Sequence, residues 1–395
     1  MEKRNTMTDW IDFDALTALG LGPAMRQQLA CGLADPKDRT MRLVAVQRDH
    51  LLLHDGHNTH RARCGSALQH DLQAQDETLA VGDWVLAQPA AGDGSDGSDG
   101  RDGHDGWRIT CRLLPQRQIS RRVICNADGG KGGFKRQALV SNVDAALLLM
   151  GLDADFNLRR LERYLALVQL AGVDAVLVLS KADTVPADRV DQRLAQARQV
   201  LPAGSSALAL DVRQPAAAVA LAPWLGLGRT VVLLGSSGAG KSTLSNTLLQ
   251  AFSARHMAHG RQATGAVRGG DGRGRHTTTV RTLLPLPGGA CIIDTPGLRA
   301  LRLEVDDADH LANAFGDVAR WAPLCRFRNC QHGQEPGCAV RDAVDAPRLQ
   351  NYHKLLREAG RDALTVQQRQ AQVALWKARG RDAHLRMRAK REAGG

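Results

Sequence analysis

The stretch RTVVLLGSSGAGKST, residues 229–243, decides the fold, because it places a glycine-rich loop between an apolar segment and a helix-forming one. The loop has the spacing G-x-x-x-x-G-K-[ST], which in this setting is typical of a phosphate-binding loop whose backbone N–H groups surround the phosphates. Lys241 is predicted to contact the β- and γ-phosphate oxygens, and Ser242 to offer its hydroxyl to Mg²⁺. The plain alternative is a glycine-rich turn that binds no ligand.

A second element of a nucleotide site, IIDTPG, follows at residues 292–297. Its apolar start predicts a strand that ends at Asp294, whose carboxylate can hold Mg²⁺ through water, and Gly297 can present its N–H to a γ-phosphate. Between the two elements lies VRGGDGRGRHTTTVR, residues 267–281. This glycine-rich stretch suits a switch that orders around Mg²⁺ and γ-phosphate, with one of the threonines 277–279 supplying a hydroxyl. A flexible basic loop is the alternative.

A guanine-binding element comes before the phosphate loop instead of after it. LSKAD, residues 179–183, follows the aliphatic run VDAVLVL and is similar to the Asn/Thr-Lys-x-Asp tetrad of GTP-binding proteins. Because α/β sheets bind ligands at the carboxyl ends of their strands, Asp183 can accept hydrogen bonds from guanine N1 and N2, which adenine cannot offer. Lys181 is predicted to lie along the base or the loop. Ser180 replaces the usual Asn or Thr, which shortens or removes one polar contact. A chance match of this short motif is the alternative.

The order of tetrad, phosphate loop, switch and D-T-P-G is a circular permutation of the usual GTPase order. Permutation is tolerated because the termini of a domain tend to lie close together at its surface. In the permuted order the segment after D-T-P-G leads directly into the C-terminal part of the chain. A nucleotide-dependent movement at Gly297 could therefore pull on that part.

The pattern over all 395 residues predicts several domains. Residues 1–40 are expected to form a helical extension. Short strand-like pieces such as RARCGSAL predict a small barrel of the oligonucleotide-binding (OB) type at 41–122, with an SH3-like barrel as the alternative. Apolar runs that alternate with amphipathic helices predict a parallel sheet covered on both faces at 123–305. Residues 306–358 are expected to be helical, and 359–395 to be a basic helix or tail.

Two further segments concern cations. GDGSDGSDGRDGHDG, residues 92–106, lacks the apolar residues of a calcium-binding β-helix and the terminal Glu of an EF-hand, so a disordered loop is predicted. CRFRNCQHGQEPGC, residues 325–338, has the form C-x4-C-x-H-x5-C, a closed set of three thiolates and one imidazole that suits structural zinc. A reduced cluster without metal is the alternative. The predicted zinc ligands are Cys325, Cys330, His332 and Cys338. The other cysteines are expected to be small buried residues: Cys31, Cys64, Cys111, Cys125 and Cys291.

The net charge of +11 points to a polyanionic partner. Basic residues gather at 112–136 and 377–391, which with the barrel give cationic surfaces suited to folded RNA; solvated helix faces or tails are the alternative. Aromatic residues make up only 4% and do not interleave with these basic runs, so recognition of backbone and shape is expected instead of base stacking. No secretory leader, membrane-length apolar run or disulfide framework is evident, which predicts a cytoplasmic protein.

The permuted order, VGDWV in the barrel, GRHTTT in the switch and the C-x4-C-x-H-x5-C cluster together resemble the RsgA (YjeQ, EngC) family over residues 41–358. The resemblance implies an N-terminal OB-fold β-barrel, a central circularly permuted α/β P-loop GTPase domain and a C-terminal helical zinc-binding domain. It implies a GTPase that binds the small (30S) ribosomal subunit and its rRNA and acts in late maturation. Slow hydrolysis would be stimulated by the subunit and coupled to release. One structural Zn²⁺ per chain, Mg²⁺ with GTP and a monomer are also implied.

Carried over residue by residue, the resemblance assigns a nucleotide site, a magnesium site and catalytic groups. The nucleotide site comprises Ser180, Lys181, Ala182, Asp183, Gly235, Ser236, Ser237, Gly238, Ala239, Gly240, Lys241, Ser242, Thr243, Asp294 and Gly297. Mg²⁺ is assigned to Ser242, Thr278 and Asp294, and catalysis to His276, Lys241 and Thr278. Many GTPases place Gln after the D-T-P-G glycine to orient water, but Leu298 stands there, and the resemblance gives this role to His276.

Two other functions stay open from the residues alone. One is a nucleotide-gated rRNA-binding scaffold in which hydrolysis is incidental. The other is a P-loop ATPase or small-molecule kinase, which is disfavoured because no acceptor site is evident and Asp183 suits guanine.

Overall fold

The computed structural model describes residues 11–33, 37–90, 106–125, 133–202, 204–258, 281–295 and 315–363. The chain divides into two units, one made of residues 1–120 and 138–301 and the other of residues 121–137 and 302–395. The predicted switch up to Val280, the Asp/Gly segment up to residue 105, Gly297 and the basic C-terminus lie outside the described residues. The predicted domain boundaries stay predictions.

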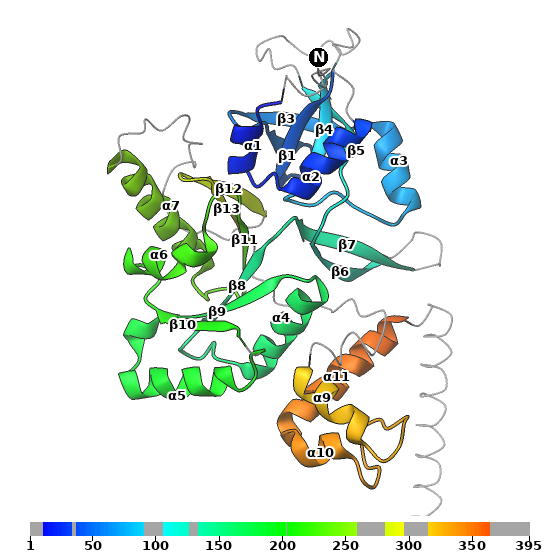
Figure 1. Ribbon diagram of the computed structural model, residues 1–395, viewed down its shortest axis with the longest axis vertical. Helices are drawn as coiled ribbons and strands as arrows, with labels where there is room; N and C mark the ends of the chain where they lie inside the picture. The colour runs from blue at the N-terminus through cyan, green and yellow to red at the C-terminus, as the bar shows by residue number, and fades with distance from the viewer. Residues whose placement is uncertain are drawn as a thin grey trace, which may run out of the picture. The chain divides into compact units, whose positions relative to one another are not determined.

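The first unit begins with two short helices and a five-stranded barrel (Figure 1). Its elements are α1 (Phe13–Ala18), α2 (Pro23–Gln28), β1 (Arg39–Val46), β2 (Leu51–His54), β3 (Thr59–Cys64), α3 (Ser66–Ala74), β4 (Trp84–Pro89) and β5 (Trp107–Arg112). The strands follow in the order β1-β2-β3-β5-β4, and pairing of β4 with β1 closes the ring around Met41, Leu53 and Ile109. β3 and β5 are parallel, and a helix follows β3. This is the OB arrangement, so the predicted barrel type is confirmed and the SH3-like alternative is wrong.

The same unit contains a six-stranded α/β sheet. Its strands are β8 (Ala145–Gly151), β9 (Asp174–Ser180), β10 (Ser206–Leu210), β11 (Thr230–Gly235), β12 (Thr282–Leu286) and β13 (Ala290–Asp294), and its helices are α4 (Leu158–Leu170), α5 (Ala187–Arg198), α6 (Ala216–Leu221) and α7 (Lys241–Ala258). The order is β10-β9-β8-β11-β13-β12, parallel except for the antiparallel β12. β12 also pairs with β1, so the sheet continues into the barrel.

Alternation along the buried strands explains why both faces of this sheet are covered. Leu147 and Leu149 of β8 belong to the core that includes Ala217 of α6 and Leu244 of α7. Successive strand residues point to opposite faces, so Leu148 is directed to the other face, where α4 packs against β8 and β9. Helices on both faces leave no solvated strand face, which is why these strands are almost uniformly apolar.

The parallel strands bring distant segments of the chain to one edge. The phosphate loop follows β11 in the middle of the sheet, the predicted base tetrad follows β9, and Asp294 ends β13. All three strands run in the same direction, so their carboxyl ends share an edge whatever the order along the chain. These segments therefore lie close together in space in spite of the permuted order.

A buried arginine connects the barrel to the strand of the phosphate loop. Arg42 of β1 is fully buried, and its guanidinium donates to Thr230 Oγ1 at 2.7 Å, to the Asn142 carbonyl at 3.0 Å and to the Leu19 carbonyl. It also lies over the Trp84 ring, 5.4 Å from the centroid. Burial lowers the pKa of Arg42, although nearby Cys291, Asp144 and Asp83 oppose that change. Backbone carbonyls and a hydroxyl thus replace the water that this cation loses.

The second unit is helical in its C-terminal part. Its helices are α9 (Gly316–Trp321), α10 (Ala339–Ala343) and α11 (Ala346–Ala363). Phe315 meets Tyr352 of α11 edge-on at 5.3 Å between centroids, and Arg348 forms an ion pair with Asp317. A separate two-stranded sheet is formed by β6 (Gln118–Cys125) and β7 (Gly133–Ser141).

Candidate nucleotide-binding site and metal centre

The backbone of the phosphate loop requires glycine at both ends. At Gly235 a Cβ would lie 2.4 Å from the Leu149 carbonyl oxygen of the neighbouring strand. Gly240 has φ +92°, a conformation that side chains disfavour, and a Cβ there would lie 3.2 Å from Val212 Cγ2. The G-x-x-x-x-G spacing thus matches two positions where the fold itself excludes a side chain.

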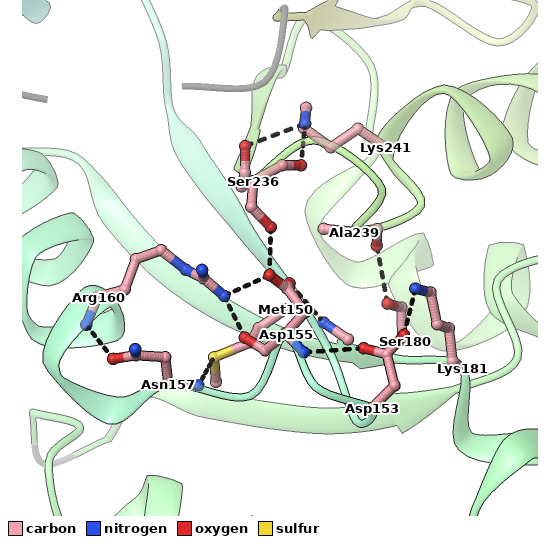
Figure 2. A network of polar contacts seen from close by, with 12 residues as sticks. Met150, Asp153, Asp155, Asn157, Arg160, Ser180, Lys181, Ser236, Ala239 and Lys241 are labelled. Atoms are coloured by element: carbon pink, nitrogen blue, oxygen red, sulfur yellow. Dashed lines mark hydrogen bonds and ion pairs between the residues drawn. The ribbon is translucent and has the colours of Figure 1, made fainter. Parts of the chain in front are cut away.

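Lys241 is held inside the loop by backbone carbonyls. Its Nζ donates to the carbonyl oxygens of Gly235 at 3.0 Å and Ser236 at 2.7 Å (Figure 2). An ammonium has three N–H donors, so these two contacts leave one for a phosphate oxygen. Burial lowers the pKa of Lys241, while the charges of Asp294 and Asp155 act against that decrease.

Ser242 and Asp294 fit a magnesium site. Ser242 Oγ lies 3.1 Å from Asp294 Oδ2, and the buried Asp294 Oδ1 has no hydrogen-bond partner within the described part of the chain. A buried carboxylate oxygen without a donor is costly unless a cation or its water shell satisfies it. Burial raises the pKa of Asp294, with Ser242 and Lys241 opposing the rise. The donor set therefore suits Mg²⁺ bound next to phosphates.

The base side of the site is connected to the phosphate loop through Ser180. Its buried hydroxyl donates to the Ala239 carbonyl at 2.7 Å, so this serine keeps a contact between tetrad and loop (Figure 2). Lys181 adopts the left-handed region at φ +61°, and its Nζ pairs with Asp153 Oδ2 at 2.7 Å. Strained backbone of this kind is concentrated at functional sites.

Asp183 lies beside an arginine that the sequence pattern did not reveal. Arg213 Nη2 donates to Asp183 Oδ2 at 2.7 Å and to Asp211 Oδ2 at 3.0 Å. The hydrogen bond from Arg213 is the main reason why the pKa of Asp211 falls to about 2. These residues follow β10, whose segment ALALD matches no base-binding motif, so only the sheet order identifies them as neighbours of the tetrad.

Several predicted site residues cannot be placed. His276, Thr278 and Gly297 lie outside the described residues, and so does Leu298. The geometry therefore concerns the phosphate loop, the base tetrad and Asp294, and the catalytic assignments stay predictions.

The predicted metal ligands come together in the second unit. One ligand atom from each of Cys325, Cys330, His332 and Cys338 lies within 4.8 Å of the others. Cys325 Sγ and Cys338 Sγ are 3.6 Å and 3.7 Å from His332 Nδ1, and 4.0 Å from each other. A tetrahedron with metal–sulfur bonds of about 2.3 Å has sulfur–sulfur edges of about 3.8 Å. The three separations among Cys325, Cys338 and His332 are close to such an edge, and Cys330 lies near enough to complete the set around one metal ion.

The structure corrects two other predictions. Arg112, counted within a basic RNA-binding stretch, is only 5% exposed in its side chain and pairs with Glu77 Oε2 at 2.6 Å and with Asp83 Oδ1 at 3.1 Å. It therefore holds the barrel together and is not available to RNA. Cys31 is exposed and Cys64 and Cys111 are only partly buried, contrary to the expectation that the scattered cysteines are buried, whereas Cys291 is buried as expected.

None of the described helices is both long enough and apolar enough to cross a membrane.

The comparisons with known proteins agree with the geometry. The sequence profile described as RsgA GTPase matches residues 121–304. A protein named small ribosomal subunit biogenesis GTPase RsgA from Xanthomonas oryzae pv. oryzae is 42% identical over 301 residues, which cover 75% of this chain and 74% of that protein. A protein of the same name from Xylella fastidiosa is 44% identical over 284 residues, which cover 71% of this chain and 75% of that protein.

A solved structure shares the fold. YjeQ from Thermotoga maritima superposes with a TM-score of 0.55 at 19% sequence identity, over 82% of this chain and 98% of that one. Together with the OB barrel, the permuted sheet and the Cys/His cluster, this likeness confirms the fold class predicted from the sequence.

Proposed function

Because the chain belongs to the RsgA GTPase family, we propose that it hydrolyses GTP and acts in biogenesis of the small ribosomal subunit. One observation carries the nucleotide part of the proposal. The Ser180 hydroxyl binds the Ala239 carbonyl, which fixes the base tetrad against the phosphate loop. A single nucleotide can therefore contact both, with its guanine at Asp183 and its phosphates at Lys241.

Guanine selectivity is proposed to depend on Asp183. A carboxylate there accepts from guanine N1 and N2, and a site built for such donors rejects a base that lacks them. Arg213 donates a hydrogen bond to Oδ2 of this carboxylate. Lys181 and Ala182 are proposed to complete the base side, and Ser237, Gly238 and Thr243 the phosphate side, with Gly297 facing the γ-phosphate.

Hydrolysis is proposed to use Lys241, Thr278 and His276. Lys241 neutralises charge on the phosphates, and Thr278 joins Ser242 and Asp294 around Mg²⁺. His276 orients the attacking water, a role that many GTPases give to a Gln at the position of Leu298. Bound Mg²⁺ would supply further stabilisation of the phosphate charge. Contact with the small subunit is proposed to order residues 267–281 and so to stimulate hydrolysis. Hydrolysis is in turn proposed to favour release.

The metal centre is proposed to hold one structural zinc ion. Four ligands leave no open position for water, which distinguishes a structural from a catalytic zinc site. The rRNA of the small subunit is the proposed partner of the basic surfaces, with Arg112 no longer included. A monomer located in the cytoplasm is part of the same proposal.

The test is GTP turnover by the purified protein, alone and with saturating small ribosomal subunits, with ATP as the control nucleotide. We expect a large increase confined to GTP. Turnover of GTP without stimulation would contradict the ribosomal role, and equal turnover of ATP would contradict selection by Asp183.

Release from subunits separates this proposal from a scaffold in which hydrolysis is incidental. With a non-hydrolysable GTP analogue the protein should stay bound to subunits that it leaves when GTP is supplied. Equal release with both nucleotides would favour the scaffold.

A further inference from the structure

A carboxylate from outside every recognised motif contacts the phosphate loop. Asp155 lies between β8 and α4, and its Oδ1 accepts a hydrogen bond from Ser236 Oγ at 2.6 Å (Figure 2). Its Oδ2 accepts from the backbone N–H of Gly151 at 3.1 Å. With both oxygens engaged and 17% of the side chain exposed, the carboxylate has a fixed orientation toward the loop.

An arginine balances the charge of this carboxylate. Arg160 Nη2 lies 2.5 Å from Asp155 Oδ1 and also donates to the Asp155 backbone carbonyl. The backbone of Arg160 is fixed in turn, because its N–H donates to Oδ1 of Asn157, the N-cap of α4, at 3.0 Å. A lone carboxylate beside a loop that binds a triphosphate would repel it, and the ion pair removes most of that repulsion.

Ser236 connects this pair to the lysine of the site. The carbonyl of Ser236 accepts from Lys241 Nζ, as does the carbonyl of the preceding Gly235. Holding the Ser236 side chain therefore holds the peptide groups that direct Lys241. Figure 2 shows the continuous series Arg160, Asp155, Ser236 and Lys241.

We propose that Asp155 and Arg160 are positioning residues of the nucleotide site. Asp155 fixes Ser236 and through it the ammonium of Lys241, and Arg160 allows a carboxylate to do so without repelling the phosphates. The inference rests on the proposed function, since it concerns the phosphates of bound GTP.

The first test is a double-mutant cycle on nucleotide affinity, measured in the full chain by titration with fluorescent GTP and GDP. Asp155→Ala and Ser236→Ala each remove the hydrogen bond between the two side chains, so each should raise the Kd for GTP about five- to tenfold. The double variant should bind GTP no more weakly than the weaker of the two single variants. Ser253→Ala is the matched control, because that exposed serine of α7 lies outside the proposed nucleotide site. The effects of this control and of Asp155→Ala on the Kd for GTP should be additive. Additivity in the Ser236 cycle would overturn the inference.

The second test concerns charge. Arg160→Ala leaves the Asp155 carboxylate unbalanced, so the Kd for GTP should rise more than the Kd for GDP, which carries less phosphate charge. Adding Asp155→Asn to Arg160→Ala should recover part of the GTP affinity. The ratio of the two Kd values does not depend on the fraction of folded protein, so a loss of structure alone would not change it.

The outcomes separate the inference from the proposed function. A wild-type protein that binds no guanine nucleotide would refute the proposed function before any variant is compared. A different result would refute only the roles of Asp155 and Arg160. In that case the wild-type protein binds GTP, Arg160→Ala leaves the ratio of the Kd values for GTP and GDP unchanged, and adding Asp155→Asn recovers no affinity.

Discussion

At the scale of single residues, the short barrel sequence VGDWV has a physical explanation. A Cβ at Gly82 would lie 2.1 Å from the Ser141 carbonyl oxygen, Asp83 pairs with Arg112, and the fully buried Trp84 supports Arg42. Gly82, Asp83 and Trp84 are therefore fixed by packing or charge within the protein. A stretch that helps to identify a family can therefore carry structure instead of chemistry.

Arg42 gives the stability prediction at this scale. Arg42→Met should lower the free energy of unfolding by about 2–4 kcal/mol, because it leaves the acceptors at Leu19, Asn142 and Thr230 buried without their donor. Arg48→Met, at an exposed arginine of the same barrel, is the control and should change stability by less than about 0.5 kcal/mol. Chemical denaturation followed by fluorescence measures both variants. Equal changes in the free energy of unfolding in the two variants would show that the hydrogen bonds of Arg42 do not stabilise the fold.

The residues of the site divide into those that a motif reveals and those that only the fold reveals. Lys241, Ser242 and Asp294 were predictable because phosphate and Mg²⁺ demand fixed residue types at fixed spacing. Asp155 and Arg213 were not predictable, because many polar residues at the end of a neighbouring strand could make the same contacts. Their role depends on which strands lie side by side, and sequence spacing does not contain that information.

At the scale of secondary-structure elements, strand patterns predicted more than loop patterns did. The strands of the α/β sheet were predictable because burial on both faces makes them continuously apolar. RARCGSAL was expected to be strand-like throughout, but β3 ends at Cys64 and α3 begins at Ser66. Gly65 separates the two: a Cβ there would lie 2.7 Å from the Ile109 carbonyl oxygen. That requirement comes from β5, far along the chain, so the local pattern could not show it.

The cluster of Cys325, Cys330, His332 and Cys338 gives a prediction at the scale of elements. The short helices α9 and α10 have few residues with which to bury apolar surface, so a metal ion is expected to stabilise this part of the second unit. Cys330→Ser should lower bound zinc from about one ion per chain to nearly none and expose residues 315–363 to limited proteolysis. Cys31→Ser, at an exposed cysteine outside the cluster, should keep both zinc and protection. Elemental analysis and mass spectrometry of the fragments measure the two effects; a zinc-free protein with unchanged protection would contradict a structural role.

At the scale of the first unit as a whole, the continuous sheet connects the barrel with the proposed switch. β12 begins at Thr282, directly after the switch segment, and Thr282 pairs with Ala45 of the barrel strand β1. On the other side of β12 lies β13, which ends at Asp294 of the nucleotide site. A partner that binds the barrel would therefore be connected, through β1, to a strand that follows the proposed switch in sequence and lies beside the proposed magnesium site.

This arrangement leads to the prediction for His276. If subunit binding orders residues 267–281 and brings His276 onto the attacking water, His276→Ala should abolish stimulation by the subunit, while the Kd for GTP stays near the wild-type value because the phosphate loop and tetrad are intact. Asp183→Asn is the informative contrast, since it should weaken GTP binding and leave the stimulated step available at saturating nucleotide. Single-turnover hydrolysis with and without small subunits separates the two effects. Full stimulation of His276→Ala would assign the water to another group, and loss of GTP binding in that variant would mean that His276 supports the ground-state complex instead of the reaction.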